Sequence, residues 1–240
     1  MHTSLSKRRF GVHICVFVES VNVSNGPLAV LHGPPPAWDL NPSSNRQFNF
    51  KLNIMSGFTA LPKGSLILVT GANGYIGSHT INVLLGLGYR VRGTVRSEKP
   101  WLSEFFHSKY DKDAFELILV PNLEDEEALG KAMAGVSGVA HVASDISMSD
   151  DPKAVIPWVV KATETALSAA AKHSSIKRFV LTSSAFAAVI PQPNKEMHID
   201  ESTWNDFAIK AAWDPNTPKE IKPGAIYSAS KAEGERAAWK

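Results

Sequence analysis

The sequence predicts an α/β fold in which helices cover both faces of a doubly wound parallel sheet. Three observations carry this prediction. From residue 64 onward, short apolar runs rich in β-forming residues alternate with stretches of helical periodicity. A glycine-punctuated turn follows the first apolar run and opens a helix. The composition is ordinary, with 44% hydrophobic and 20% charged residues among 240, which excludes a wholly disordered or fibrous chain.

The expected elements alternate regularly along the chain. The strands are short apolar runs bounded by turn residues, at 65–70, 89–95, 115–120, 138–142 and 178–182. The helices have apolar residues spaced by three and four, at 75–87, 101–109, 124–133, 151–172 and 227–240. Segment 190–222 is rich in proline, has little periodicity and is expected to be a loop. Strand–helix–strand units of this length favour parallel strands joined by right-handed crossovers.

The first quarter of the chain differs from the rest. It contains a proline run, Pro34–Pro36, and a polar tract, Asn41–Asn45, which bury too little apolar surface to offset the entropy of ordering. We therefore expect 1–57 to be a disordered or non-native extension and 58–240 to be the folded domain. A targeting peptide is the alternative, because Lys7–Arg9 precede an apolar stretch. That stretch is short and ends at Glu19, which favours the extension.

Composition also limits the partners. The net charge of +2 gives no reason to expect a nucleic acid or a membrane surface. The single cysteine, Cys15, excludes an internal disulfide framework and fits a reducing environment, so we expect a cytoplasmic protein. The eight histidines form no HxxxH or HExxH set, so no metal site is expected, and His141 is interpreted as a packed core residue. No apolar run reaches the roughly 18 residues that span a bilayer.

The sequence VTGANGYIG at 69–77 is the most informative local motif. Its glycines stand as GxxGxxG between an expected strand and an expected helix. Gly71 allows a tight turn, Gly74 lets the backbone approach a pyrophosphate, and Gly77 lets helix and strand pack closely. Tyr75 and Ile76 open the helix, whose free N–H groups and positive dipole end attract an anion. We therefore predict a dinucleotide-binding loop formed by Gly71, Gly74, Tyr75, Ile76 and Gly77.

The end of the second expected strand predicts which dinucleotide binds. NAD-binding proteins of this type carry an acidic residue about 20 residues beyond the glycines, where it holds the ribose 2′-hydroxyl. At this position the chain has Arg96, and the strand end has no Asp or Glu. A guanidinium suits a 2′-phosphate because it offers paired N–H donors. The expected cofactor is therefore NADPH, with Arg92 on the same strand face as a second, weaker candidate.

A tyrosine–lysine pair supplies the expected chemistry. Tyr227 and Lys231 form a YxxxK motif whose spacing places both side chains on one helix face. A phenol titrates near pH 10, and a neighbouring ammonium favours the phenolate. The run Thr182-Ser183-Ser184 follows the last expected strand, and strand carboxyl ends line the ligand crevice in such sheets. The spacing does not choose between Ser183 and Ser184 as the hydroxyl that binds a carbonyl oxygen.

Together these motifs resemble the extended short-chain dehydrogenase/reductase superfamily, which has a Rossmann-type sheet. Within it the chain looks most like the dihydroflavonol-reductase-like branch, especially the fungal NADPH-dependent aldehyde/carbonyl reductases. The matching stretches lie at 61–66, 69–77, 91–97, 139–144, 177–184, 190–194 and 227–240.

The resemblance implies specific residue roles. It makes Ser184, Tyr227 and Lys231 the catalytic set, and places Leu123 and Ala143 beside the adenine and ribose. Relatives often have Asp before that leucine, where this chain has Asn122. Members of the branch also continue beyond the YxxxK helix, which implies a sheet that is incomplete at its C-terminal end and a substrate-binding part that is absent.

The expected reaction is therefore reduction of a small aldehyde or ketone by NADPH, with Tyr227 as proton donor. Two alternatives remain. One is a sugar-nucleotide epimerase or dehydratase of the same superfamily. Arg96 argues against it, because those enzymes commonly retain NAD. The other is an inactive nucleotide-binding fragment.

Overall fold

A computed structural model describes residues 5–6, 12–15, 60–192, 194 and 196–240. The chain divides into two units, Met1–Val18 together with Ala60–Lys240, and Glu19–Thr59. The second unit lies outside the described residues. So does most of the expected extension 1–57, including Lys7–Arg9 of the alternative targeting peptide, whereas residues 12–15 of its apolar stretch are described.

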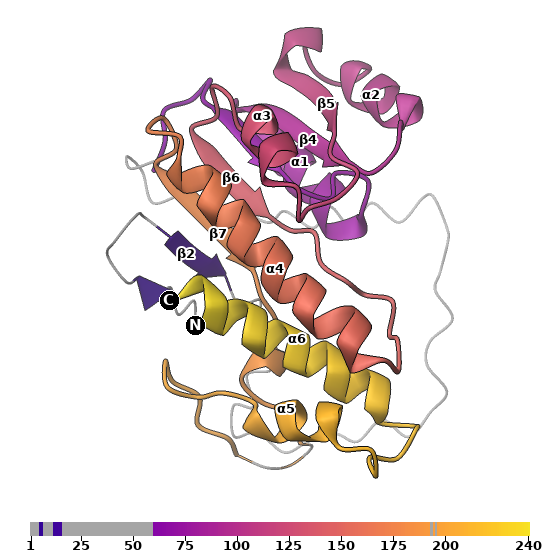
Figure 1. Cartoon of the computed structure of the whole chain (residues 1–240). Helices are drawn as coiled ribbons and strands as arrows, with labels where there is room; N and C mark the ends of the chain where they lie inside the picture. The colour runs from indigo at the N-terminus through magenta and orange to yellow at the C-terminus, as the bar shows by residue number, and fades with distance from the viewer. Residues whose placement is uncertain (1–4, 7–11, 16–59, 193, 195) are drawn as a thin grey trace, which may run out of the picture. The chain divides into compact units, whose positions relative to one another are not determined.

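The described residues form a seven-stranded sheet in the order β1-β2-β7-β6-β3-β4-β5 (Figure 1). All neighbouring pairs are parallel except β1 with β2. The strands are β1 (Leu5–Ser6), β2 (Val12–Cys15), β3 (Leu66–Val69), β4 (Arg90–Val95), β5 (Phe115–Leu119), β6 (Gly138–His141) and β7 (Arg178–Thr182). The expected parallel sheet is confirmed. Strands β1 and β2, with β2 paired to the outer edge of β7, are not expected from the sequence.

Strand β3 lies at the centre of the doubly wound arrangement. Val69 is paired with Gly93 on β4 and with Ala140 on β6. The chain winds outward from β3 in one direction through β4 and β5, and in the other through β6 and β7. The strand order therefore reverses between β3 and β6, and in such sheets the ligand crevice lies outside the carboxyl ends of the strands at this reversal.

The helices lie between and after the strands. They are α1 (Tyr75–Gly86), α2 (Pro100–His107), α3 (Glu126–Ala132), α4 (Pro152–Ala171), α5 (Asp206–Trp213) and α6 (Lys222–Ala238), with 3-10 turns η1 (Lys112–Ala114) and η2 (Ala185–Ala187). Asp125 caps α3 by accepting a hydrogen bond from Ala128 N, and Asp151 caps α4 through Lys153 N. Pro152 occupies the first turn of α4, where its missing N–H costs nothing.

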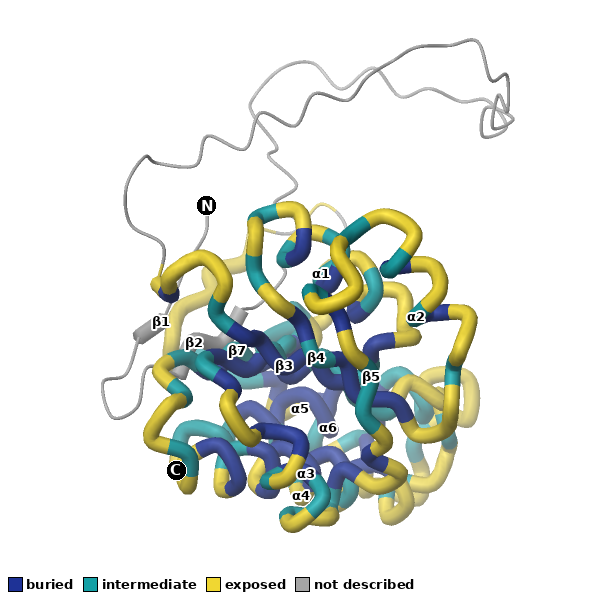
Figure 2. The backbone as a smooth tube through the Cα atoms, turned by 90° about the horizontal axis from the view of Figure 1, so that it is seen from above, coloured by how far each residue is buried: buried dark blue, intermediate teal, exposed yellow. Residues whose placement is uncertain are grey.

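Each face of the sheet buries its own hydrophobic core. Leu66 and Leu68 point into a core shared with α3 and α4, whereas Ile67 and Val69 point into a core shared with α1 and α2. Figure 2 shows the buried strands running between exposed outer surfaces. Burial on both faces explains why β3 reads as a continuous apolar run rather than as an alternating one.

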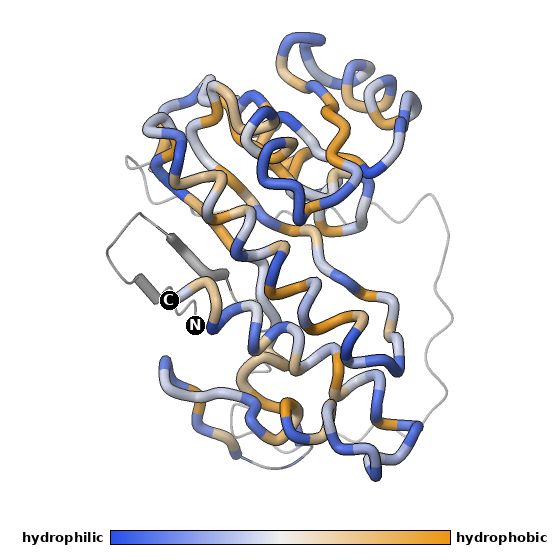
Figure 3. The backbone as a smooth tube through the Cα atoms, viewed as in Figure 1, coloured by the Kyte–Doolittle hydropathy of each residue, from blue (hydrophilic) through white to orange (hydrophobic). Residues whose placement is uncertain are grey.

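Helices α4, α5 and α6 form a third packed group. Helix α6 lies along α4 (Figure 1), and Ile226 and Ala229 of α6 pack against Val159 of α4 and Ala212 of α5. Hydrophobic and hydrophilic residues alternate along α4 in Figure 3, as a helix with one buried face requires.

The expected loop at 190–222 contains a helix, α5, which is a correction. The prediction failed because α5 is short and part of its stabilisation comes from a distant residue. Arg236 of α6 pairs with Asp206 at 2.7 Å, in addition to the local cap in which Asn205 accepts from Ala208 N at 3.0 Å. Helix α6 also begins earlier than expected, at Lys222, with Pro223 in its first turn.

Candidate active site

The glycine loop has the geometry of a narrow backbone cradle at the start of α1. Gly71 has a φ of +71°, a region that disfavours side chains, and Gly74 N donates to Gly71 O at 3.0 Å. A Cβ atom on Gly77 would lie 2.1 Å from Gly71 O. The cradle therefore excludes any side chain at position 77.

The start of α1 is open to an anion. Its N-cap, Gly74, makes no side-chain cap, and the first turn holds no acidic residue. Tyr75 and Ile76 of that turn are exposed. Unfilled N–H groups and an uncompensated dipole end at a strand-to-helix turn suit a pyrophosphate. On these observations the loop fits a dinucleotide.

Strand β4 fixes the loop from one side. Gly71 N donates to Thr94 Oγ1 at 3.3 Å, and Ala72 N donates to Thr94 O at 3.0 Å. A Cβ atom on Gly93 would lie 2.6 Å from the Cβ of Ala72, so this position on β4 must also lack a side chain. The loop backbone is thereby tied to the strand that ends at Arg96.

Strand β6 fixes the loop from the other side. Thr70 Oγ1 accepts hydrogen bonds from Val142 N and Ala143 N, both at 3.0 Å, and lies 3.1 Å from His141 Nδ1. Both Thr70 and His141 are buried, and burial together with the charge of Lys231 lowers the pKa of His141 to about 4. Ala143 is brought against Gly71, so a Cβ atom on that glycine would lie 3.2 Å from the Cβ of Ala143.

The two arginines of β4 have different environments. Arg92 is fully engaged: its guanidinium pairs with Glu116 at 2.8 Å and donates to Ala132 O and Ala134 O at 2.7 and 2.8 Å. It joins β4 to β5 and to the end of α3, which corrects the idea that it assists a phosphate. Arg96 is exposed just beyond β4 and has no ion pair with any described residue.

The turn after β5 supplies Leu123 and Asn122. Leu123 is buried in the core that β3 shares with α3 and α4. Asn122 Oδ1 accepts from Glu124 N at 3.0 Å. The NH₂ group of Asn122 donates to no described residue, so it remains available as a donor.

Helix α6 brings Tyr227 and Lys231 to the carboxyl ends of β6 and β7. Lys231 Nζ donates to Thr182 O at 2.9 Å and to Ser144 Oγ at 3.4 Å. Only 8% of this lysine is exposed, and burial lowers its pKa to about 8, with Glu235 acting in the opposite direction. Tyr227, one helical turn earlier, is half-buried and faces the ring of Phe186 at a centroid distance of 6.4 Å.

The two serines after β7 have different roles in the structure. Ser183 is buried, and its hydroxyl donates to Glu235 Oε2 at 2.5 Å. Ser184 is partly exposed; among the described residues its Oγ accepts from Phe186 N at 3.2 Å and donates to none, so its proton is available to another acceptor. Of the two serines, Ser184 is thus the one whose hydroxyl proton is not committed to a described residue.

Sequence reasoning missed the residues that shape the wall beside Tyr227. Phe186 is 40% exposed, and its carbonyl accepts from Asn205 Nδ2 at 2.8 Å. Asn205 N also donates to Ala187 O at 2.9 Å. The polar Asn205 ahead of a helix was a capping signal in the sequence, but its second partner is 19 positions away and no local pattern indicates it.

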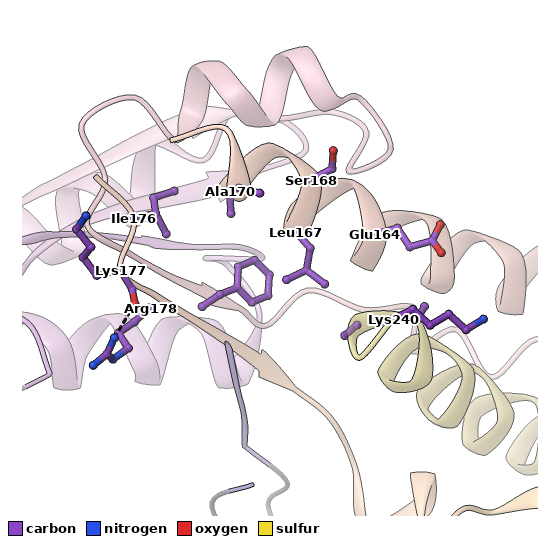
Figure 4. Close-up of a pocket in the computed structure, with 12 residues that line it drawn as sticks. Glu164, Leu167, Ser168, Ala170, Ile176, Lys177, Arg178 and Lys240 are labelled. Atoms are coloured by element: carbon purple, nitrogen blue, oxygen red, sulfur yellow. Dashed lines mark hydrogen bonds between the residues drawn. The ribbon is translucent and has the colours of Figure 1, made fainter. Parts of the chain in front are cut away.

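A separate cavity lies at the opposite end of β7. Its volume is about 440 Å³, and apolar groups such as Leu167, Ile176 and Phe179 line it where β7 begins and α6 ends (Figure 4). It is not part of the crevice, because Ser184 follows the carboxyl end of that strand.

Within the described part of the chain, no three His, Cys, Asp or Glu side chains gather as a metal site would require. None of the described helices combines the length and apolar character needed to cross a bilayer.

Residues 67–240 match the NAD dependent epimerase/dehydratase family, which covers both the glycine loop and the YxxxK helix. The chain belongs to this family. Its fold and the extended short-chain dehydrogenase/reductase resemblance are therefore confirmed.

Family members similar to this chain include reductases. A ketoreductase, nvfG, of Aspergillus novofumigatus is 43% identical over 185 residues, covering 76% of this chain and 54% of its own length. Aldehyde reductase 2 of Sporidiobolus salmonicolor is 44% identical over 183 residues, covering 75% and 53%. The structure of yeast methylglyoxal/isovaleraldehyde reductase Gre2, complexed with NADPH, aligns with a TM-score of 0.58 and 28% identity, covering 72% and 52%. This epimerase/dehydratase family member thus spans about half the length of the curated relatives it matches.

Proposed function

We propose that this protein binds NADPH along the carboxyl edge of its sheet and reduces an aldehyde or ketone to an alcohol. The observation that carries the proposal is the position of Lys231. Its ammonium reaches the ends of β6 and β7 at once, through Ser144 and Thr182, and Tyr227 lies one turn away on the same helix face. The named reductases among its relatives support the same reaction class.

The cofactor would be held by groups around the crevice. The backbone of Gly71–Gly77 and the start of α1 would bind the pyrophosphate, Arg96 would pair with the 2′-phosphate, and Lys231 would donate to ribose hydroxyls. Ala143 and Leu123 shape the floor beneath the nucleoside. When bound, NADPH supplies the hydride that reduces the carbonyl carbon.

The protein's own side chains control the carbonyl oxygen. Ser184 donates a hydrogen bond that polarises and orients it, because the proton of its hydroxyl is given to no acceptor in the described part of the chain. Tyr227 transfers its phenolic proton to the same oxygen as negative charge develops there. The ammonium of Lys231 stabilises the negative phenolic oxygen that remains. Phe186 presents an apolar edge beside Tyr227, which favours substrates with an apolar group next to the carbonyl.

Arg96 separates this proposal from the epimerase or dehydratase alternative. An enzyme that regenerates a retained NAD has no need for a guanidinium at the 2′ position, whereas an NADPH-consuming reductase does.

The test is loss of NADPH absorbance when the protein is mixed with simple aldehydes and ketones, compared between wild type and Tyr227→Phe. The proposal expects turnover in wild type and a fall of about 100-fold or more in the variant, the usual scale for a lost proton donor. Full turnover by Tyr227→Phe contradicts the role of Tyr227. A protein that binds NADPH tightly but oxidises none with any carbonyl contradicts the reductase assignment.

A further inference from the structure

Glu235 is a buried carboxylate that neither the glycine loop nor the serine–tyrosine–lysine set uses. Only 8% of the residue is exposed. It accepts the hydroxyl proton of Ser183 at 2.5 Å, across 52 positions of sequence. Burying a charge costs free energy unless the charge is hydrogen-bonded and balanced by an opposite charge, so the burial of Glu235 requires a structural explanation.

The position of Glu235 on α6 provides that explanation. Tyr227, Lys231 and Glu235 follow one another at intervals of four, so they form one line on the helix face turned toward the sheet. Lys231 donates to the carbonyl of Thr182, and the next residue, Ser183, donates to Glu235. Two successive residues of the β7 end are therefore tied to α6, and the residue that follows them is Ser184.

We propose that Glu235 is a positioning residue, which anchors the β7 end through Ser183 and supplies the negative charge that balances the buried ammonium of Lys231. The inference rests on the proposed reductase function, because it assigns Glu235 to the same site. Glu235 touches neither substrate nor cofactor in this scheme. It acts through Lys231 and through the backbone that carries Ser184.

The charged and titratable groups around Lys231 come from two elements. His141 faces it from β6 and is neutral near pH 7, because burial and the ammonium itself hold the pKa of His141 at about 4. Tyr227 and Glu235 share α6 with it, and Thr182 and Ser144 offer only neutral oxygen atoms. Among the described residues, Glu235 is the acidic group whose charge opposes the effect of burial on the pKa of Lys231.

Two substitutions separate the charge of Glu235 from its hydrogen bond. Glu235→Gln keeps an acceptor for Ser183 and removes the charge, whereas Ser183→Ala keeps the charge and removes the bond. Glu233→Gln is the matched control, since Glu233 lies on the same helix and makes no hydrogen bond or ion pair among the described residues. Carbon-13-labelled lysine reports the titration of Lys231 by NMR, with the signal assigned by its absence in Lys231→Met.

The Lys231 midpoint is expected to fall by roughly one pH unit in Glu235→Gln and to stay unchanged in Ser183→Ala and Glu233→Gln. Ser183→Ala is expected to lower turnover without moving the pH profile. An unchanged midpoint in folded Glu235→Gln overturns the inference. If that variant does not fold, Glu235→Ala, which also removes the charge, decides by the same criterion: a lowered Lys231 midpoint supports the inference, and an unchanged midpoint overturns it. The NMR titration needs no turnover. If the wild type reduces no carbonyl but the Lys231 midpoint still falls in Glu235→Gln, the reductase function is refuted while the electrostatic effect of Glu235 on Lys231 is supported.

Discussion

Thr70 and His141 form a buried hydrogen bond that joins the carboxyl ends of β3 and β6, with 3.1 Å between Oγ1 and Nδ1. Thr70 Oγ1 already accepts two backbone N–H groups, so its proton must go to Nδ1. His141 is therefore neutral and carries its own proton on Nε2. This pair holds Ala143 against Gly71 and makes the floor of the nucleotide loop dependent on an uncharged histidine.

Lowering the pH should destabilise the fold through His141. His141 has a pKa of about 4 in the folded chain, below its ordinary value of 6.5. Between these values the unfolded chain binds a proton that the folded chain does not, so the free energy of unfolding falls as pH falls from 6.5 to 4. The slope is at most about 1.4 kcal/mol per pH unit. Urea denaturation of wild type and His141→Asn measures it. Between pH 7 and pH 4 we expect the free energy of unfolding of the wild type to fall by up to about 3 kcal/mol more than that of the variant. Equal decreases would refute a neutral, buried His141.

Arg96 should determine the preference for NADPH. Arg96→Ala removes a charge-assisted pair with the 2′-phosphate, which is worth about 1.5–3 kcal/mol, so the Kd for NADPH should rise roughly 10-fold to 100-fold. The Kd for NADH should hardly change. Arg92→Met is the control, because Arg92 pairs with Glu116 and two carbonyls of the α3 end. It is expected to lower thermal stability and to leave the NADPH/NADH ratio as it is. A ratio altered by Arg92→Met and not by Arg96→Ala contradicts the placement.

Gly77 should tolerate no side chain. A Cβ atom there meets the backbone oxygen of Gly71 at 2.1 Å, so Gly77→Ala must displace the loop or the start of α1. We expect NADPH binding to weaken at least about 10-fold, measured by fluorescence titration. Gly224→Ala is the comparison, since a Cβ atom there meets nothing within 4 Å and α6 gains helix propensity of about 1 kcal/mol at most. Unaltered binding by Gly77→Ala would show that the loop does not hold the cofactor.

Phe186 should shape the choice of substrate. Its ring lies edge-on to Tyr227, and Asn205 holds its backbone, so Phe186→Ala removes an apolar wall without displacing Ser184. We expect KM for aromatic ketones to rise by roughly 10-fold, while KM for a small aliphatic aldehyde changes little. Steady-state kinetics with the two substrates provide the measurement. An equal effect on both would place Phe186 outside the substrate contacts.

The sequence predicted those parts of the fold whose signals are local. The β3 run and the helix that follows the glycines were predictable because burial on both sheet faces and the GxxGxxG turn leave their pattern in adjacent residues. The bounds of β7 also agree with the prediction. Helix α5 was missed because its stability comes from Arg236 and from packing on α6, which are distant in sequence.

The site shows the same division between local and distant signals. Tyr227 and Lys231 share a helix face, and their spacing alone indicates a pair. The difference between Ser183 and Ser184 depends on Glu235, 52 positions from Ser183, and the difference between Arg92 and Arg96 depends on Glu116 and the end of α3. Residue type and spacing carry no information about such partners, so only the three-dimensional structure separates them.

The central claim is a cofactor site that prefers NADPH, and calorimetric titration of the 240-residue chain with NADPH and with NADH tests it most directly. The account predicts one NADPH per chain, bound at least about 10-fold more tightly than NADH, because Arg96 pairs only with the 2′-phosphate. Equal affinities would contradict the role of Arg96. Binding of neither nucleotide by the folded protein would contradict the site itself.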